Sequence, residues 1–178
     1  MAAVFAFKIL AAMVVWWIFT RHYPSSDLQD YMEDGKTLFY NLFHPGAKRP
    51  LTIWDASFEG TLFNGSRIMI LLNALIIPFS FGNIYVHFVF FCFLSFWGML
   101  LLYRSFLQHF PDKKNLLLLL VFCVPDVFFF SSGIFKESLA LCLTGAVVGL
   151  SDFGLRQKYS TRLLLLLSVL MGLLFLLK

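Results

Sequence analysis

The sequence predicts an all-α polytopic membrane protein with five or six hydrophobic helices and an amphipathic surface helix in the first loop. Of its 178 residues, 60% are apolar and only 13% are charged, whereas a soluble domain carries about a quarter charged residues. Apolar runs recur along the chain, and several approach the roughly 20 residues that a spanning helix needs. This composition excludes a soluble cytosolic enzyme, because too much apolar surface would face water.

The first apolar run, residues 3–19, predicts the first transmembrane helix. Lys8 lies in its middle and no Ala-x-Ala cleavage site follows, so the run is interpreted as an uncleaved helix rather than a signal peptide. Residues 20–66 form the one long polar segment and hold six of the ten acidic residues. We expect this segment to be an acidic exoplasmic loop of a single membrane domain, residues 1–178.

A helix over about residues 27–43 is predicted inside that loop. Ser26 and Gln29 have capping-box spacing, and His44-Pro45-Gly46 is a stop signal. The expected apolar side consists of Leu28, Met32, Phe39, Leu42 and Phe43, and the expected polar side of Asp27, Asp30, Tyr31 and Asp34. This division predicts an amphipathic helix that lies on the membrane surface.

The remaining apolar runs predict the other membrane helices. Residues 68–81 contain Asn73 and Pro78 and number fewer than the roughly 17 needed to span, so they are interpreted as a short span or a half-helix. Further transmembrane helices are predicted at residues 84–103, 115–130, 138–150 and 163–177, and Pro125 breaks the second of these near its end.

The basic loops predict the orientation, because Lys and Arg in short loops stay on the cytoplasmic side. Residues 104–114 and 151–162 carry three Lys or Arg residues each and are separated by two spans, so both loops are expected to be cytoplasmic. Lys136 then lies on the exoplasmic side. If residues 68–81 do not cross the membrane, the acidic loop lies on the same side as Lys136, and this arrangement is favoured. If they cross, the acidic loop lies on the same side as the basic loops.

Two polar segments are candidates for chemistry. Asp27, Asp30 and Asp34 lie within two turns and repel one another by a few tenths of a kcal/mol per pair, which a metal ion, a basic side chain or a substrate cation would relieve. The structural alternative is that acidic residues near a helix N-terminus interact favourably with the helix dipole. Both interpretations of this row stay open.

The second segment begins where Ser131, Ser132 and Gly133 interrupt an apolar run. Lys136 and Glu137 then stand at the start of the next helix. Hydroxyls, free amides and an ammonium at a helix N-terminus favour an anion-binding site. The alternative is that the lysine extends to the lipid headgroups or pairs with its neighbouring glutamate.

These two segments carry a resemblance to a known family. Asp27-Leu-Gln-Asp-Tyr31 is similar to the Asp-x-x-x-Tyr signature in the first external loop of the GT-C superfamily of polytopic glycosyltransferases. Residues 125–137, Pro-Asp-Val-Phe-Phe-Phe-Ser-Ser-Gly-Ile-Phe-Lys-Glu, resemble a Pro-Ser-x-x-Phe-Trp-Ser-Ser-Gly-x-x-Lys-Glu/Asp segment of bacterial polyprenyl-linked sugar transferases, from which Asp126 and Phe130 depart. The chain resembles the N-terminal portion of such an enzyme, or a short relative.

The resemblance implies transfer of a sugar from a polyprenyl-phosphate carrier at the exoplasmic face of a bacterial inner (cytoplasmic) membrane. It makes Asp27 the general base, and Asp30 and Asp34 the groups that position the acceptor or hold a divalent cation. It gives phosphate binding to Lys136, Ser131, Ser132 and Gly133, with Tyr31 and Glu137 in supporting roles. The implied partners are membrane lipid, the lipid-linked sugar and further membrane subunits.

Two other functions are weighed beside this one: a non-catalytic small subunit of a larger membrane complex and, third, a transporter component. No nucleic-acid binding is expected, because the basic residues stand singly or in pairs at the ends of apolar runs. Three smaller features carry structural predictions. His87 is expected to be a hydrogen-bonded interior residue, Gly145-x-x-x-Gly149 to allow close helix packing, and the three cysteines to serve packing.

Overall fold

The computed structural model describes residues 2–23, 27–43 and 65–177, and the regular structure in these ranges is helical throughout. The α-helices are α1 (Ala2–His22), α2 (Asp27–Phe43), α3 (Gly65–Ser80), α4 (Ile84–His109), α5 (Lys114–Phe122), α6 (Pro125–Phe130), α7 (Lys136–Gln157) and α8 (Thr161–Leu176), with a 3₁₀ turn η1 (Pro111–Lys113) after α4. The prediction of an all-α fold is confirmed.

Three of the helices, α1, α4 and α7, are long and apolar enough to cross a membrane, and α3 and α8 are shorter apolar helices. The chain therefore has the helices of a membrane protein, while the count of five or six crossings stays a prediction. The predicted span at residues 115–130 consists of two pieces, α5 and α6, separated at Cys123 and Val124. Pro125 explains the break, because a proline disfavours helical backbone at the preceding residue.

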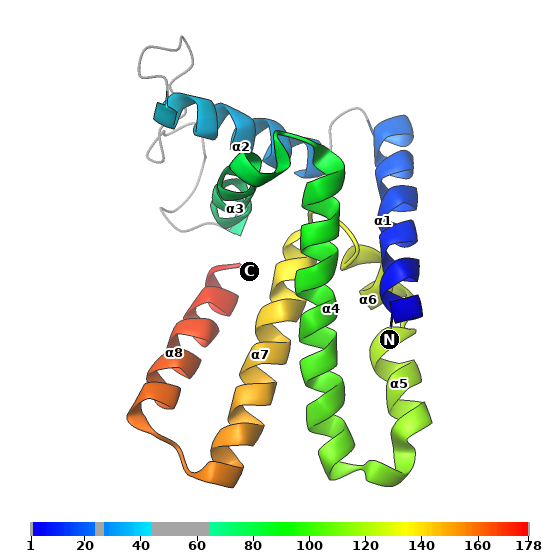
Figure 1. Ribbon diagram of the computed structural model, residues 1–178, viewed down its shortest axis with the longest axis vertical. Coiled ribbons are helices and arrows are strands. Elements are labelled where there is room, and N and C mark those ends of the chain that lie inside the picture. The colour runs from blue at the N-terminus through cyan, green and yellow to red at the C-terminus, as the bar shows by residue number, and fades with distance from the viewer. Residues whose placement is uncertain (1, 24–26, 44–64, 178) are drawn as a thin grey trace.

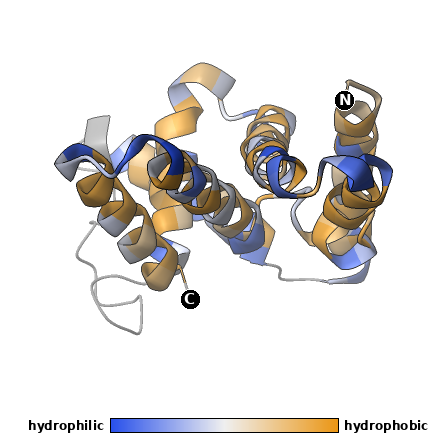
Figure 2. Ribbon diagram, turned by 90° about the horizontal axis from the view of Figure 1, so that it is seen from below, coloured by the Kyte–Doolittle hydropathy of each residue, from blue (hydrophilic) through white to orange (hydrophobic). Residues whose placement is uncertain are grey.

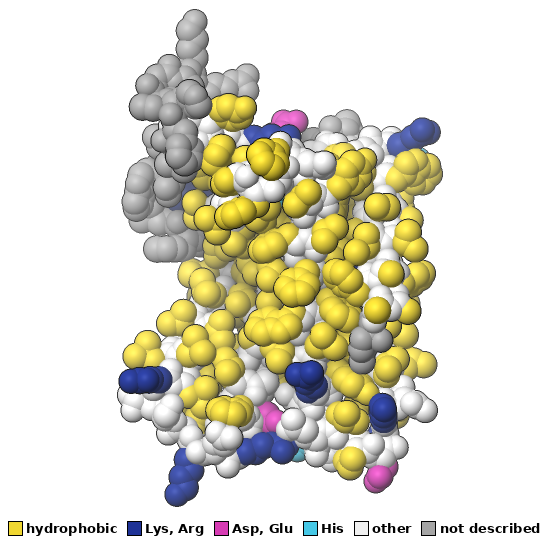
Figure 3. Space-filling model, viewed as in Figure 1, with side chains coloured by type: hydrophobic (Ala, Val, Ile, Leu, Met, Phe, Trp, Pro, Cys, Tyr) yellow, Lys and Arg dark blue, Asp and Glu magenta, His cyan; other side chains and the backbone are white. Residues whose placement is uncertain are grey.

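The two central helices, α4 and α7, run side by side along the long axis of the molecule (Figure 1). Helices α1, α5 and α6 lie on one side of this pair and α8 on the other, while α2 and α3 lie together at the end where α4 begins. Apolar side chains cover the middle of the visible face in Figure 3. Figure 2 shows the molecule from below, at the end away from α2 and α3. The helices are largely hydrophobic, with hydrophilic residues at their ends and turns.

Glycine allows α4 and α7 to meet at backbone distance. A Cβ placed on Gly145 would overlap the backbone of Gly98, and one on Gly98 would overlap Leu141 and Cys142. A Cβ on Gly149 would meet Leu101 at an ordinary 3.5 Å. The predicted close approach is therefore confirmed, and it occurs at Gly145. Small residues are the usual means of such contact between membrane helices, where dispersion forces drive association.

Helix α2 has the predicted bounds, and its exposed Asp27 and Asp30 and buried Leu28 and Met32 lie on the predicted sides. The prediction is wrong at Tyr31. The side packed on α3 buries Leu28, Met32 and Leu38, and also Tyr31, which we had expected on the polar side. Tyr31 lies three residues after Leu28, so helical periodicity places it in the buried stripe. The capping residue Ser26, the stop signal at residues 44–46 and the side chains of Leu42 and Phe43 lie outside the described part.

The two basic turns share one end of the molecule, as predicted. His109 at the end of α4 lies 3.6 Å from the Asp152 carboxylate of α7, which also receives Arg156 at 3.3 Å. Both helices run further than predicted, since α4 includes Arg104 and α7 includes residues 151–157. The connecting turns are correspondingly short. Which side of a membrane this end occupies stays a prediction.

A buried polar network joins α3 to α4. His87 is fully buried; its Nδ1 lies 2.7 Å from Asn73 Oδ1 and its Nε2 2.8 Å from Ser80 Oγ. The Asn73 amide nitrogen donates to the Met69 carbonyl, so its oxygen faces the ring and Nδ1 carries the proton. The prediction for His87 is confirmed. Gly82 (φ +73°) forms the turn between the two helices.

Candidate functional site

The two polar segments predicted to act together lie at the same end of the molecule. Lys136, the first residue of α7, places its Nζ 6.0 Å from the centroid of the Tyr31 ring on α2. Tyr31 in turn lies with its hydroxyl 3.5 Å from Ser66 Oγ, at the start of α3. Residues more than one hundred positions apart thus form one contact, in which a cation lies near an aromatic face.

The candidate carboxylates lie on α2, the helix that carries Tyr31. Asp27 and Asp30 are exposed and Asp34 is half-buried. Burial raises the pKa of Asp34, and the neighbouring charges of Asp30 and Glu33 raise it further. At the other end of the molecule, Asp152 makes ion pairs with His109 and Arg156. The site therefore has solvent-accessible carboxylates on one helix and a half-buried cation on another.

The loop over residues 131–135 is buried rather than open. Ser131, Ser132, Gly133 and Ile134 are all buried, whereas Glu137 is exposed. The Ser132 hydroxyl donates to the Phe128 carbonyl at 2.5 Å, and the Ser131 hydroxyl accepts from Lys8. Both hydroxyls are thus engaged inside the protein, so the described contacts hold the loop in place. Their predicted binding of phosphate stays a prediction, and Lys136 is the accessible cation of this segment.

Lys8 is the functional candidate to which sequence analysis gave no role. It is fully buried; its Nζ donates to Ser131 Oγ at 2.5 Å and lies 5.3 Å from the centroid of the Phe128 ring. A lysine in the middle of an apolar run was the available signal, because ionisable residues inside membrane helices are costly and commonly functional. What the sequence could not show is that Lys8 contacts the loop that precedes Lys136.

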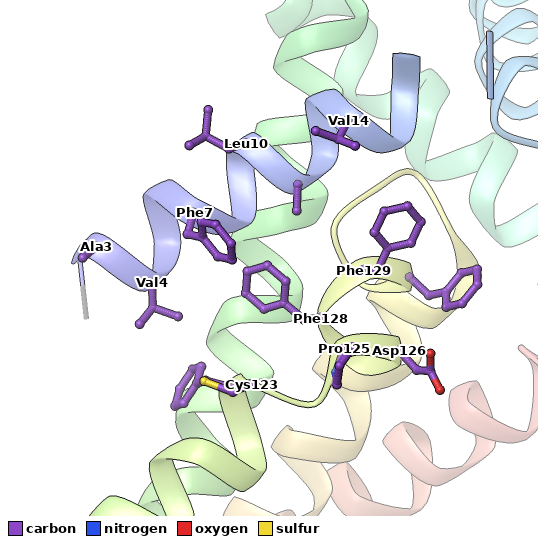
Figure 4. Close-up of a pocket in the computed structure, with 13 residues that line it drawn as sticks. Ala3, Val4, Phe7, Leu10, Val14, Cys123, Pro125, Asp126, Phe128 and Phe129 are labelled. Carbon is purple, nitrogen blue, oxygen red and sulfur yellow. The ribbon is translucent and has the colours of Figure 1, made fainter. Parts of the chain in front are cut away.

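An apolar groove of about 840 Å³ lies between α1 and the α5–α6 pair (Figure 4). Figure 4 shows Phe7 and Leu10 of α1 on one side and Phe128 and Phe129 of α6 on the other, with the Asp126 carboxylate directed away from α1. The groove has almost no polar lining, so a hydrocarbon chain is the ligand that its chemistry suits.

A smaller pocket lies near the end of α6 that leads into the buried loop. It measures about 370 Å³ and is lined by Asp126, Val127, Phe130, Ser131 and Glu137. Two carboxylates beside a hydroxyl give this pocket an acidic border. It therefore adds no positive charge to the candidate phosphate site.

The described residues contain no group of three or more His, Cys, Asp or Glu side chains placed to hold a metal ion. The predicted divalent cation is thus left as a prediction. Of the three cysteines, Cys92 and Cys142 are buried in the expected way. Cys123 is exposed and lines the apolar groove, which corrects its assignment to packing.

Comparison with protein-family models, curated proteins and solved structures finds no match to this chain.

Proposed function

We propose that this chain is a GT-C-like glycosyltransferase, or a component of one, that takes a sugar from a polyprenyl-phosphate carrier at the exoplasmic face of a bacterial inner membrane. The observation that carries the proposal is the contact between the two motif segments, in which Lys136 Nζ lies 6.0 Å from the Tyr31 ring centroid. Had the segments lain at opposite ends, no single substrate could reach both.

The proposed reaction is a substitution at the anomeric carbon of the sugar. Asp27 accepts the proton of the acceptor hydroxyl, whose oxygen forms the new bond to that carbon. The bond from the carbon to the carrier phosphate breaks, and the phosphate oxygen leaves with the electron pair. Lys136 stabilises the charge that develops on it. Asp30 and Asp34 orient the acceptor or hold a divalent cation, while Tyr31 supports Lys136.

The groove between α1 and α6 supports a lipid-linked donor. Its lining is apolar, and it ends at the segment that leads through the buried loop to Lys136. In this proposal a prenyl chain lies in the groove with its phosphate toward the loop. The tail stays in hydrocarbon while the headgroup meets water.

A second candidate is a non-catalytic subunit of a larger membrane complex. Helix α8 buries none of its residues, although it is one of the most apolar segments of the chain. In a complex, part of that surface would contact another membrane helix. A catalytic chain and a subunit differ in their need for Asp27 and Lys136.

Sugar transfer by membranes that contain the protein tests the proposal. The assay follows the sugar from radiolabelled undecaprenyl-phosphate hexoses into an acceptor fraction. We expect Asp27→Asn to lower the rate by about 10²-fold or more, the usual contribution of a general base, and Lys136→Met by about 10²-fold, as for a lost oxyanion donor.

Asp112→Asn and Lys113→Met are matched controls, because they make the same changes in η1 near the opposite end. They should leave the rate unchanged. Wild-type transfer that survives both Asp27→Asn and Lys136→Met contradicts the enzyme assignment. Co-purification of other membrane proteins in fixed ratio with an inactive wild type favours the subunit.

A further inference from the structure

We propose that Lys8 is a positioning residue, which holds the buried loop over residues 131–135 and thereby sets the place of Lys136. The contact that carries this inference is the hydrogen bond from Lys8 Nζ to Ser131 Oγ, at 2.5 Å, across 123 positions of sequence. The link to phosphate binding rests on the proposed function. The structural role of Lys8 does not.

The burial of Lys8 is too costly to be incidental. Its side chain has no exposed area, and α1 is otherwise an apolar helix of spanning length. An ammonium removed from water must be compensated by partners, and an apolar residue would fit this position without that cost. In the described ranges its contacts are the Ser131 hydroxyl and the Phe128 ring, with no carboxylate paired to it.

The loop is otherwise held from the two central helices. The Ser131 carbonyl accepts from Ser95 Oγ of α4 at 2.7 Å, and the Gly133 carbonyl accepts from Ser138 Oγ of α7 at 2.7 Å. Cys92 Sγ of α4 lies 3.5 Å from the Ser132 carbonyl. Lys8 adds the side-chain hydrogen bond from α1, so the loop is held from three helices.

The loop in turn determines where Lys136 lies. Phe135 is its last residue and also the residue that precedes α7, and its ring packs 5.4 Å from that of Phe19 on α1. Lys136 follows directly and faces Tyr31. A loop that moves away from α1 would therefore move the ammonium relative to α2. In this way Lys8 acts on a ligand through the loop and without touching it.

The test replaces Lys8 by methionine and uses the native thiols as reporters. Methionine keeps the length of the side chain, and its sulfur packs well against the Phe128 ring, while the donor to Ser131 is lost. Cys92 lies behind the loop and Cys142 lies at the α4–α7 contact. In a Cys123→Ala background, which removes the exposed thiol, alkylation of each cysteine by N-ethylmaleimide is followed by peptide mass spectrometry.

We expect Lys8→Met to speed alkylation of Cys92 about tenfold and to leave Cys142 unchanged, because the loop opens locally. Ser131→Ala, which removes the acceptor, should act in the same direction. An unchanged Cys92 rate in both variants overturns the proposal. An equal rise at Cys92 and Cys142 also overturns it, because Lys8 would then support the whole bundle rather than the loop.

A binding comparison tests the link to phosphate. Farnesyl phosphate and farnesol share an apolar tail and differ in the phosphate, so wild-type protein in detergent should bind the phosphate more tightly. We expect Lys8→Met to weaken binding of farnesyl phosphate about tenfold, as for one lost charged hydrogen bond, and to leave farnesol unchanged. Equal losses for both overturn the positioning role. If the wild type fails to distinguish the two, the proposed function fails, and the Cys92 rate still decides the role of Lys8.

Discussion

Helix α4 meets its neighbours in two different ways. Toward α7 the contact is between backbones, at Gly98 and Gly145, and Cys142 lies beside it. Toward α1 and the buried loop, α4 presents Cys92 and Ser95, whose side chains approach loop carbonyls, and Lys8 completes the polar cluster from α1. One side of α4 is thus a close apolar contact and the other a set of buried polar contacts.

The glycine contact between α4 and α7 serves as the scaffold of the bundle, whereas the polar contacts of α4 lie near the candidate site. Glycine packing needs no hydrogen-bond partner and fixes the distance between two long helices. Buried polar groups usually need a partner, and here Lys8, Ser95 and Ser131 supply it to one another where α1, α4 and the buried loop meet. Those segments are the ones that lead to Lys136 and Tyr31. If this division is correct, changes on the two sides of α4 should have different consequences.

The largest effect is expected on the glycine side. Gly145→Ala adds a methyl group that would overlap the backbone of Gly98, so the helices must separate. We expect a loss of about 3 kcal/mol in the free energy of unfolding, the upper end of usual overpacking costs. Thermal or denaturant unfolding in detergent measures it.

Gly172→Ala in α8 is the matched control, because a Cβ at that position meets nothing within 4 Å in the described structure. It should be neutral or slightly stabilising, since alanine is the better helix former. A Gly145→Ala protein as stable as the Gly172→Ala protein would contradict the assignment of this contact as the scaffold.

The glycine contact also shows what a sequence can and cannot predict. Gly145 was singled out from its spacing to Gly149, yet its contact is with Gly98, which carries no motif. Periodicity and apolar length located the helices, because each property is local to one segment. Contacts between segments depend on how helices turn about their own axes, and no single segment determines that.

The same limit applies to the candidate site. The sequence singles out Asp27 and Lys136 by their types and positions. Their common end of the molecule belongs to only one of the two arrangements that it allows, the favoured one in which residues 68–81 do not cross. Tyr31 was assigned to the wrong face because polarity was weighted above helical spacing. The engagement of Ser131 by Lys8 depends on α1 lying against α6, which no pattern within either segment encodes.

An intermediate effect is expected from His87, which makes a further set of buried polar contacts between α4 and α3. His87→Leu removes the ring partner of the buried Asn73 Oδ1, while Ser80 Oγ keeps its hydrogen bonds to Ile77 and Gly82. We expect a loss of about 2 kcal/mol in the free energy of unfolding, as for an unsatisfied buried polar group. The double variant Asn73→Leu, His87→Leu should lose less than the sum of the single variants.

His109→Leu serves as the comparison for that change. His109 is on the same helix, but its side chain is 56% exposed; its Nε2 lies 3.6 Å from the Asp152 carboxylate and its Nδ1 2.9 Å from the Ser105 carbonyl. Exposed ion pairs contribute about 1 kcal/mol or less. If both histidine variants lose the same stability, the buried polar contacts contribute no more to stability than the exposed ones, which contradicts the importance given to burial.

The smallest effect is expected at Asp34, on the helix that carries the candidate carboxylates. Burial, followed by the charges of Asp30 and Glu33, raises the pKa of Asp34 in the folded protein. The folded state therefore binds protons more readily than the unfolded chain. Its stabilising contribution is full below the unfolded pKa and is lost as pH rises through the folded pKa. At neutral pH the charged carboxylate accordingly costs stability.

Asp34→Asn should remove that cost and raise the free energy of unfolding at neutral pH by a few tenths of a kcal/mol, as for like-charge helix pairs. It should also make the free energy of unfolding depend less on pH in the acidic range. Unfolding in detergent across a pH series measures both. Glu33→Gln is the control: it removes one neighbouring charge, so it should lower the pKa of Asp34 and give part of the same gain. If Asp34→Asn instead destabilises the protein at neutral pH, the charged form has a favourable partner. In that case the charged Asp34 carboxylate helps to hold α2 in place.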